Sequence, residues 1–295
     1  MKKNVQAGYL LCSLALSVIL TACSDESNNE GEVQHEDIVI QEASASETPE
    51  ETPAEVNTAA EPAEEQENAD AGKENEEQSL TEEKEEYEMK DPVLLYMGHA
   101  SLRIVTGEDK VIYIDPFAGN GYNMTADLIL QTHDHFDHKD MSKISSKSSD
   151  CVVITQKEAL KGGTHNSFDQ GYVKVEAVEA GYNKNHDKKN CVGYILTFSN
   201  GTTLYVSGDT SKTDQMPELA ARDLDYAFFC CDGVFNMDAA EASECASLVG
   251  AKVNIPYHTG SASETIFDEA NAARFTAPGA YILKPGEELV LKKGQ

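Results

Sequence analysis

The six residues His-Asp-His-Phe-Asp-His at positions 133–138 limit the possible folds of this chain more than any other feature. They follow closely on the largely apolar run at 127–130, which is typical of a buried strand. Neutral imidazoles and carboxylates are the ligands that zinc prefers, and an α/β sheet presents ligands at the carboxyl ends of its strands. The pattern therefore predicts a metal site at such an edge, with four candidate ligands: His133, His135, Asp137 and His138.

One such cluster does not supply enough ligands for two ions, so a dinuclear site requires further histidines or carboxylates downstream. His186, Asp209 and His258 each lie beside a predicted strand and complete the candidate set. His165, which follows Gly162 and Gly163, competes with His186 for the third place on the first ion. His186 comes just before the predicted strand at 192–198, but the residues alone leave this choice open.

Short β-rich runs closed by turn residues predict most of the fold. The expected strands are 93–97, 101–106, 110–114, 126–132, 151–155, 172–178, 192–198, 202–207, 224–230, 253–257, 280–283 and 288–291. Asn200-Gly201 between two of them predicts a tight hairpin, because Gly supplies the positive φ that such a turn requires. The expected helices are 140–145, 157–161, 239–250 and 263–273, the last with Ser261 or Ser263 as its N-cap. The alternation favours a single layered α/β domain over residues 91–295.

The N-terminal residues are typical of an exported protein. Lys2 and Lys3 precede an apolar stretch that is short for a permanent membrane span, and residues 1–22 are therefore expected to be a signal peptide. The residues before Cys23 resemble the bacterial lipobox, which implies cleavage before Cys23 and lipidation of its thiol. We expect a location at the outer side of a bacterial cell membrane, with this lipid as the anchor.

Charge separates the next segment from the rest of the chain. Residues 24–90 hold 24 acidic residues against three lysines, with almost no aromatic residues, so residues 23–90 are expected to form the lipid anchor and an acidic disordered linker. The formal net charge is −29 for the whole chain, but residues 91–295 are only mildly acidic. No cluster of Lys and Arg there could neutralise a phosphate backbone, which argues against nucleic acid as a partner and against a nuclease.

The order and spacing of these candidate ligands resemble the metallo-β-lactamase superfamily over residues 93–290. The resemblance implies an α/β fold, the four-layer αββα metallo-β-lactamase sandwich. It also implies the division of the ligands between two ions. The first ion would be bound by His133, His135 and His186, the second by Asp137, His138 and His258, with Asp209 bridging both.

Three further stretches resemble one branch of this superfamily. Gly98-His99-Ala100-Ser101, Ile114-Asp115-Pro116-Phe117 and the run at 205–210 are similar to L-ascorbate-6-phosphate lactonase and to the N-acyl phosphatidylethanolamine phospholipase D group. Class B β-lactamases typically have Cys at the position of Asp209, which argues against antibiotic hydrolysis. His99 is expected to pack or to donate a hydrogen bond beside the site, and Asp115 to fix a loop through Pro116.

The function implied is a metal-dependent hydrolase in which a hydroxide bridging two divalent ions attacks an ester, lactone or phosphodiester of a small-molecule substrate. Asp137 is the candidate catalytic residue, because it could bind the second ion and orient the water. Zinc suits the ligands first, while manganese or iron would also be accommodated. The alternatives are a lipid-directed phosphodiesterase and a non-catalytic metal- or nucleotide-binding protein of the same fold. The oligomeric state is not readable from the sequence.

Overall fold

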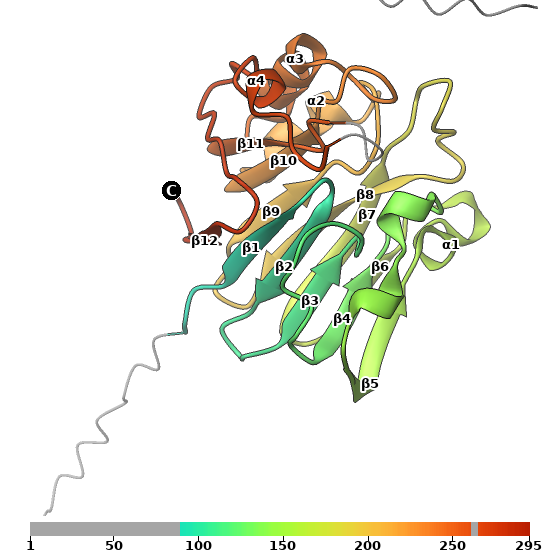
Figure 1. Cartoon of the computed structure of the whole chain (residues 1–295), viewed down its shortest axis with the longest axis vertical. Helices are drawn as coiled ribbons and strands as arrows, with labels where there is room; N and C mark the ends of the chain where they lie inside the picture. The colour runs from blue at the N-terminus through green and yellow to red at the C-terminus, as the bar shows by residue number, and fades with distance from the viewer. Residues whose placement is uncertain (1–88, 261–264) are drawn as a thin grey trace, which may run out of the picture. The chain divides into compact units, whose positions relative to one another are not determined.

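Two six-stranded sheets form the body of the protein. The structure is a computed structural model that describes residues 89–260 and 265–295 of the 295-residue chain. The expected signal peptide, Cys23 and nearly all of the acidic linker lie outside these residues. Within them, no helix is both long and apolar enough to cross a lipid bilayer. Figure 1 shows the first sheet, in teal and green, in front of the second, in yellow and orange.

The first sheet contains the N-terminal strands and the last strand of the chain. Its order is β12-β1-β2-β3-β4-β5. The pairs from β12 to β3 are antiparallel, whereas β3 with β4 and β4 with β5 are parallel. The strand bounds are β1 Val93–Gly98, β2 Ser101–Val105, β3 Val111–Ile114, β4 Ala126–Leu130, β5 Lys147–Ile154 and β12 Glu288–Val290.

The second sheet contains the middle of the domain in the order β11-β10-β9-β8-β7-β6. Strands β6 to β9 are antiparallel, and β9, β10 and β11 are parallel. The strand bounds are β6 Ser167–Asp169, β7 Val173–Glu179, β8 Val192–Phe198, β9 Thr203–Val206, β10 Tyr226–Cys230 and β11 Val253–Tyr257.

The main hydrophobic core draws on strands of both sheets. Leu94, Leu102 and Ile112 of the first sheet share one buried cluster with Tyr194 and Phe228 of the second. Because side chains alternate between the two faces of a strand, every second residue of these strands points into this core. The two sheets thus form a sandwich, and the predicted α/β class is confirmed.

The outer faces of the sandwich are covered unequally. The longest helix, α3 (Ala239–Val249), packs on β10 and β11, and Gly250, the last residue of the predicted helix, ends it in the left-handed conformation. The shorter helices are α1 Gln156–Ala159, α2 Met216–Leu219 and α4 Glu269–Ala272. A second, smaller cluster that includes Met97, Tyr113 and Ile129 lies on the other face of the first sheet, where the covering elements are loops and 3-10 turns.

Most predicted elements are present, and three differ. Residues 280–283 form no strand, because only a single bridge joins Ala280 to Asn254. Residues 140–145 form only the 3-10 turn Met141–Lys143. The last predicted helix is reduced to α4, which begins after Asp268, whose carboxylate accepts from Asn271 N and so takes the N-cap role that Ser261 or Ser263 was expected to fill. Both serines lie outside the described residues.

Strand direction determines where a site can form. The parallel pairs β3–β4 and β9–β10–β11 bring the carboxyl ends of five strands to one edge of the two sheets. The segments that follow these strands begin with Asp115, Gln131, Ser207, Cys231 and His258. All the predicted ligands except His186, which follows β7, lie on these segments.

Candidate metal centre

The loop after β4 is held in place by a buried carboxylate at the end of β3. Asp115 Oδ1 accepts from Thr132 N at 2.8 Å, and its Oδ2 accepts from Thr132 Oγ1 at 2.7 Å. The same Oδ2 lies 2.9 Å from His138 Nδ1. Asp115 is therefore more than a loop residue, because it also sets the orientation of the last histidine of the motif and leaves His138 Nε2 free to bind a metal.

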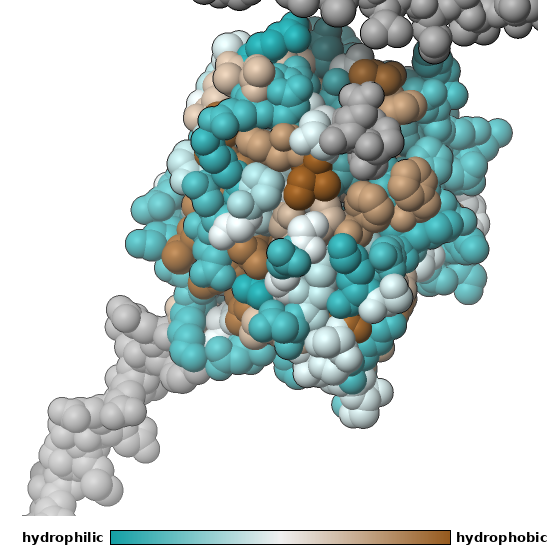
Figure 2. Space-filling model, viewed as in Figure 1, coloured by the Kyte–Doolittle hydropathy of each residue, from teal (hydrophilic) through white to brown (hydrophobic). Residues whose placement is uncertain are grey.

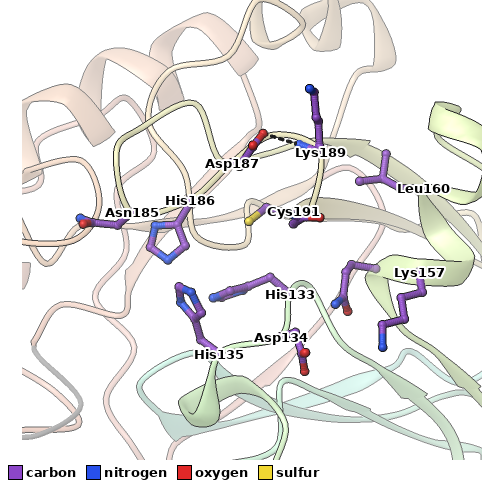
Figure 3. A pocket seen from close by; sticks show the side chains of 12 residues that line it. His133, Asp134, His135, Lys157, Leu160, Asn185, His186, Asp187, Lys189 and Cys191 are labelled. Carbon is purple, nitrogen blue, oxygen red and sulfur yellow. Dashed lines mark hydrogen bonds between the residues drawn. The ribbon is translucent and has the colours of Figure 1, made fainter. Parts of the chain in front are cut away.

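His133, His135 and His186 come together from two separate loops. The ring centre of His186 lies 5.0 Å from the ring centre of His133 and 4.8 Å from that of His135. One nitrogen of each of the three rings also lies within 4.8 Å of the other two. His186 is on the loop between β7 and β8, where Asn183 Oδ1 accepts from its backbone N at 2.9 Å. In Figure 3 the three rings lie next to one another at one end of a pocket.

His165 does not join this group. It lines a different cavity, together with Glu179, Tyr182 and Lys188, and none of the candidate metal clusters among the described residues includes it. Of the two histidines that the sequence left open, the structure thus brings His186 to His133 and His135.

Asp209 lies at the centre of four histidines. Its Oδ2 is 3.2 Å from His258 Nε2, 3.4 Å from His186 Nε2, 3.5 Å from His138 Nε2 and 4.0 Å from His133 Nε2. All five side chains are almost completely buried. A single oxygen of Asp209 is therefore close to imidazoles from three other segments of the chain.

A second candidate ligand group combines Asp137, His138 and His258 with His99. His99 Nε2 lies 3.1 Å from Asp137 Oδ2, and the ring of His99 is tilted against that of His258 with 3.7 Å between their centres. His99 is fully buried in the turn between β1 and β2 and has a φ of +51°. It is placed beside the site, as the sequence predicted, and its contact is with a carboxylate.

The unpartnered atoms of this cluster fit a divalent cation. His133 Nε2, His138 Nε2 and Asp209 Oδ1 are buried without a hydrogen-bond partner among the described residues. Buried polar atoms are normally paired, so a set of unpaired imidazole nitrogens around a carboxylate requires a ligand of its own. Imidazole and carboxylate are the donors that zinc and related ions take, and the residues present therefore fit such ions.

The electrostatics of the cluster keep its carboxylate ionised. Burial raises the pKa of Asp209, but His258 and His138 outweigh this effect and hold that pKa well below its usual value. Burial also lowers the pKa of His133 well below its usual value, with a further contribution from His138. A neutral imidazole and an ionised carboxylate are the forms that bind a metal.

Two polar residues of the site carried no recognisable signal in the sequence. Asn236 Nδ2 donates to Asp209 Oδ2 at 2.8 Å and to Asp232 Oδ2 at 2.8 Å. Asp232 follows β10 by two residues and precedes Gly233, so in the sequence it looks like an ordinary turn residue. Only its position at the carboxyl end of a central strand could have suggested a role.

A cavity of about 460 Å³ adjoins the first ligand group. Its lining includes His133, His135 and His186 together with Gln156, Lys157 and Lys189. Figure 3 shows Cys191 between the histidines and the lysine side chains. A small molecule in this cavity would lie directly against the candidate ligands.

Comparison with known proteins gives the family of the chain. A family model described as a beta-lactamase superfamily domain matches residues 93–258. A UPF0173 metal-dependent hydrolase of Nitratidesulfovibrio vulgaris is 30% identical over 232 residues, which cover 68% of this chain and 96% of that protein. The chain belongs to the metallo-β-lactamase superfamily, in the UPF0173 metal-dependent hydrolase family. It is thus a metal-dependent hydrolase, and its His and Asp cluster could hold the metal.

Solved structures agree with this assignment to the metallo-β-lactamase superfamily. A crystal structure from Parabacteroides distasonis superposes with a TM-score of 0.54 at 27% identity, covering 65% of this chain and 93% of that one. Igni18, a metallo hydrolase from Ignicoccus hospitalis, superposes with a TM-score of 0.52 at 18% identity, covering 68% of this chain and 98% of that one. The second likeness shows the fold alone.

Proposed function

We propose that this metallo-β-lactamase-fold protein hydrolyses an ester, lactone or phosphodiester at a site that holds two divalent ions. Zinc is the metal that suits the ligands best. The observation that carries the proposal is the position of Asp209 Oδ2 within 3.2 to 4.0 Å of four histidine Nε2 atoms. This is the arrangement expected of a carboxylate that binds two ions at once. His133, His135 and His186 would hold one ion, and Asp137, His138 and His258 the other.

Two ions held there would lower the pKa of a shared water and polarise an oxygen of the substrate. The protein supplies the orientation of the ligands and buries most of them, while His135 is exposed. Asp137 is 14% exposed, whereas Asp209 is 4% exposed, so Asp137 is the more accessible of the two carboxylates. This exposure, and its contact with His99, support a role for Asp137 in holding a proton of the attacking water.

The experiment compares metal-free and zinc-loaded protein on a chromogenic phosphodiester and on a panel of lactones and carboxylic esters. We expect turnover of at least one class by the loaded protein only, and its loss in Asp209→Ala. Asp134→Ala is the matched control, because Asp134 lies within the same motif but is exposed and paired with Lys139. Metal uptake without turnover of any substrate would favour the non-catalytic binding protein.

A second candidate, a phosphodiesterase for substrates with a hydrocarbon group, is favoured by exposed apolar residues near the site. Phe136 is 66% exposed between His135 and Asp137, and Val234 and Phe235 are exposed just before Asn236. Apolar side chains also gather near the centre of the face drawn in Figure 2. Large exposed apolar residues that gather in a patch are typical of binding surfaces.

This candidate predicts a dependence on chain length. Each buried CH₂ group contributes about 0.8 kcal/mol, so kcat/KM should rise up to about fourfold per added carbon for as long as the chain contacts the protein. Phe136→Ser should flatten that series, whereas Tyr281→Ser, an exposed aromatic residue elsewhere in the domain, should not. A flat series in the wild type would exclude this candidate and leave the first one standing.

We also propose anchoring of the protein to the outer side of the bacterial cell membrane through Cys23. The motif before Cys23 supports the proposal. Metabolic labelling with palmitate should mark the wild type and not Cys23→Ser, and equal labelling of both would contradict it.

A further inference from the structure

The loop between β10 and α3 carries two polar side chains that make direct contact with the predicted metal ligands. Asp232 is on this loop with a side chain that is 0% exposed. Its Oδ1 accepts from the backbone N of Val234 at 2.8 Å and of Phe235 at 2.6 Å. One carboxylate oxygen thus fixes the loop and leaves the other, Oδ2, to face the site.

The second oxygen of Asp232 lies between a ligand and an amide. It is 3.5 Å from His258 Nδ1 and 2.8 Å from Asn236 Nδ2. His258 therefore has a carboxylate on each side, because its other nitrogen, Nε2, lies 3.2 Å from Asp209 Oδ2. A carboxylate near Nδ1 favours the tautomer with the proton on Nδ1, and this tautomer leaves Nε2 able to bind a metal.

The orientation of the Asn236 amide follows from its neighbours. Its Nδ2 is 2.8 Å from an oxygen of Asp209 and 2.8 Å from an oxygen of Asp232. Ionised carboxylates only accept hydrogen bonds, so the NH₂ group must face both of them and the amide oxygen must point elsewhere. Asn236 Oδ1 is indeed buried without a partner among the described residues.

We propose that Asp232 and Asn236 are positioning residues of the metal centre, with Asp232 orienting His258 and Asn236 orienting Asp209. The inference rests on the proposed function, namely that the cluster binds two ions. Neither Asp232 nor Asn236 was among the predicted ligands. The amide of Asn236 joins Asp232 to Asp209.

A similar carboxylate–histidine pair, with a shorter distance between its atoms, is present at the first sheet. Asp115, at the end of β3, lies 2.9 Å from His138 Nδ1, and His138 Nε2 faces Asp209. Asp232, after β10, faces His258 Nδ1 in the same way but at 3.5 Å, too far for a hydrogen bond. The two histidines proposed for the second ion are thus each backed by a carboxylate from a different sheet. Asn236 adds a donor to the carboxylate that they share.

The two residues should leave different signatures on metal binding. Among the predicted ligands Asp232 faces only His258, so Asp232→Asn should weaken the binding of the second ion most and leave the other within about threefold of the wild type. Asn236 contacts the proposed bridging carboxylate, so Asn236→Ala should weaken the binding of both. Loss of such a supporting contact typically lowers metal affinity 10- to 100-fold.

The test is a titration of the metal-free full chain with Zn²⁺ by calorimetry and with Co²⁺ by visible absorption, which resolves two binding steps. Asn185→Ala is the matched control, because Asn185 Nδ2 donates to the backbone oxygen of Phe235 on the same loop and to no carboxylate of the described residues. We expect this control to bind both ions as the wild type does. Thermal unfolding of the metal-free variants checks that each one is folded.

Asp232→Asn keeps the size of the side chain and an oxygen for the backbone N–H groups, so it remains informative if Asn236→Ala is unstable. A wild type that binds two ions while both variants bind them with unchanged affinity would overturn the positioning roles alone. A wild type that binds no ion would overturn the proposed function, and the positioning roles with it.

Discussion

His138 Nδ1 lies 2.9 Å from Asp115 Oδ2, and both side chains are completely buried. Burial lowers the pKa of His138, but Asp209 and Asp115 outweigh it and raise that pKa well above its usual value. Each nitrogen of this imidazole therefore has its own carboxylate, one structural and one a candidate metal ligand. The contact explains why a metal-binding loop after β4 depends on a residue at the end of β3.

Asp115→Asn should lower zinc affinity by about 10- to 100-fold, because the amide cannot accept from Thr132 and His138 in the way that the two carboxylate oxygens do. Asn tolerates the φ of +45° found at this position, so the backbone should be preserved. Competition with a chromogenic chelator measures the affinity. An unchanged affinity in a folded variant would mean that Asp115 supports the loop only.

His186→Ala should weaken the binding of the first ion by at least tenfold, whereas His165→Ala should leave the metal content unchanged. The reason is that, of these two histidines, His186 has its ring about 5 Å from those of His133 and His135, whereas His165 lines a different cavity. Metal content per protein, measured after dialysis, distinguishes the two. A loss confined to His165→Ala would reverse this assignment.

Gly208→Ala should disturb Asp209. Gly208 has a φ of +62°, and an added Cβ would lie 2.6 Å from the backbone oxygen of Val192. We expect a destabilisation of more than about 1 kcal/mol in denaturant unfolding, together with weaker metal binding. Gly201→Ala is the control, because Gly201 also has a positive φ but no atom of the described residues lies within 4 Å of the added Cβ. It should lose some stability and keep its metal.

Asp225 lies far from the metal centre and should make the free energy of unfolding depend on pH. Burial raises its pKa, but hydrogen bonds from Thr203 N, Lys252, Gly294 N and Lys293 outweigh it and lower the pKa to about 2. Because the folded pKa lies below the unfolded value of 3.8, this stabilisation is present above about pH 4 and is lost as the pH falls through 2. Its size is about 2 kcal/mol.

Asp225→Asn should therefore lower the free energy of unfolding by about 2 kcal/mol at pH 7 and flatten its decrease between pH 4 and pH 2. Asp223→Asn makes the same chemical change at a side chain that is 81% exposed and should have little effect. Urea unfolding of the metal-free protein at several pH values measures both variants. Parallel pH profiles for the wild type and Asp225→Asn would contradict the prediction.

Local patterns in the sequence determined much of the fold. Strands such as β1 and β8 were predictable because each is a short apolar, β-rich run closed by turn residues. The hairpin at Gly201 was predictable because few residues tolerate the positive φ that it requires. The candidate ligands at 133–138 were predictable because three imidazoles and two carboxylates within six residues are rare outside metal sites.

Contacts between distant segments decided the rest. Residues 280–283 have a β-rich composition but join the second sheet by one bridge only, since pairing depends on a neighbouring strand and not on composition. The sequence left His186 and His165 as alternatives, because nothing local shows which loop folds towards His133. Asp232 and Asn236 look like turn residues until β10 places them beside Asp209 and His258. Ligand types are a local property of the chain, whereas their meeting point is fixed by which strands run parallel.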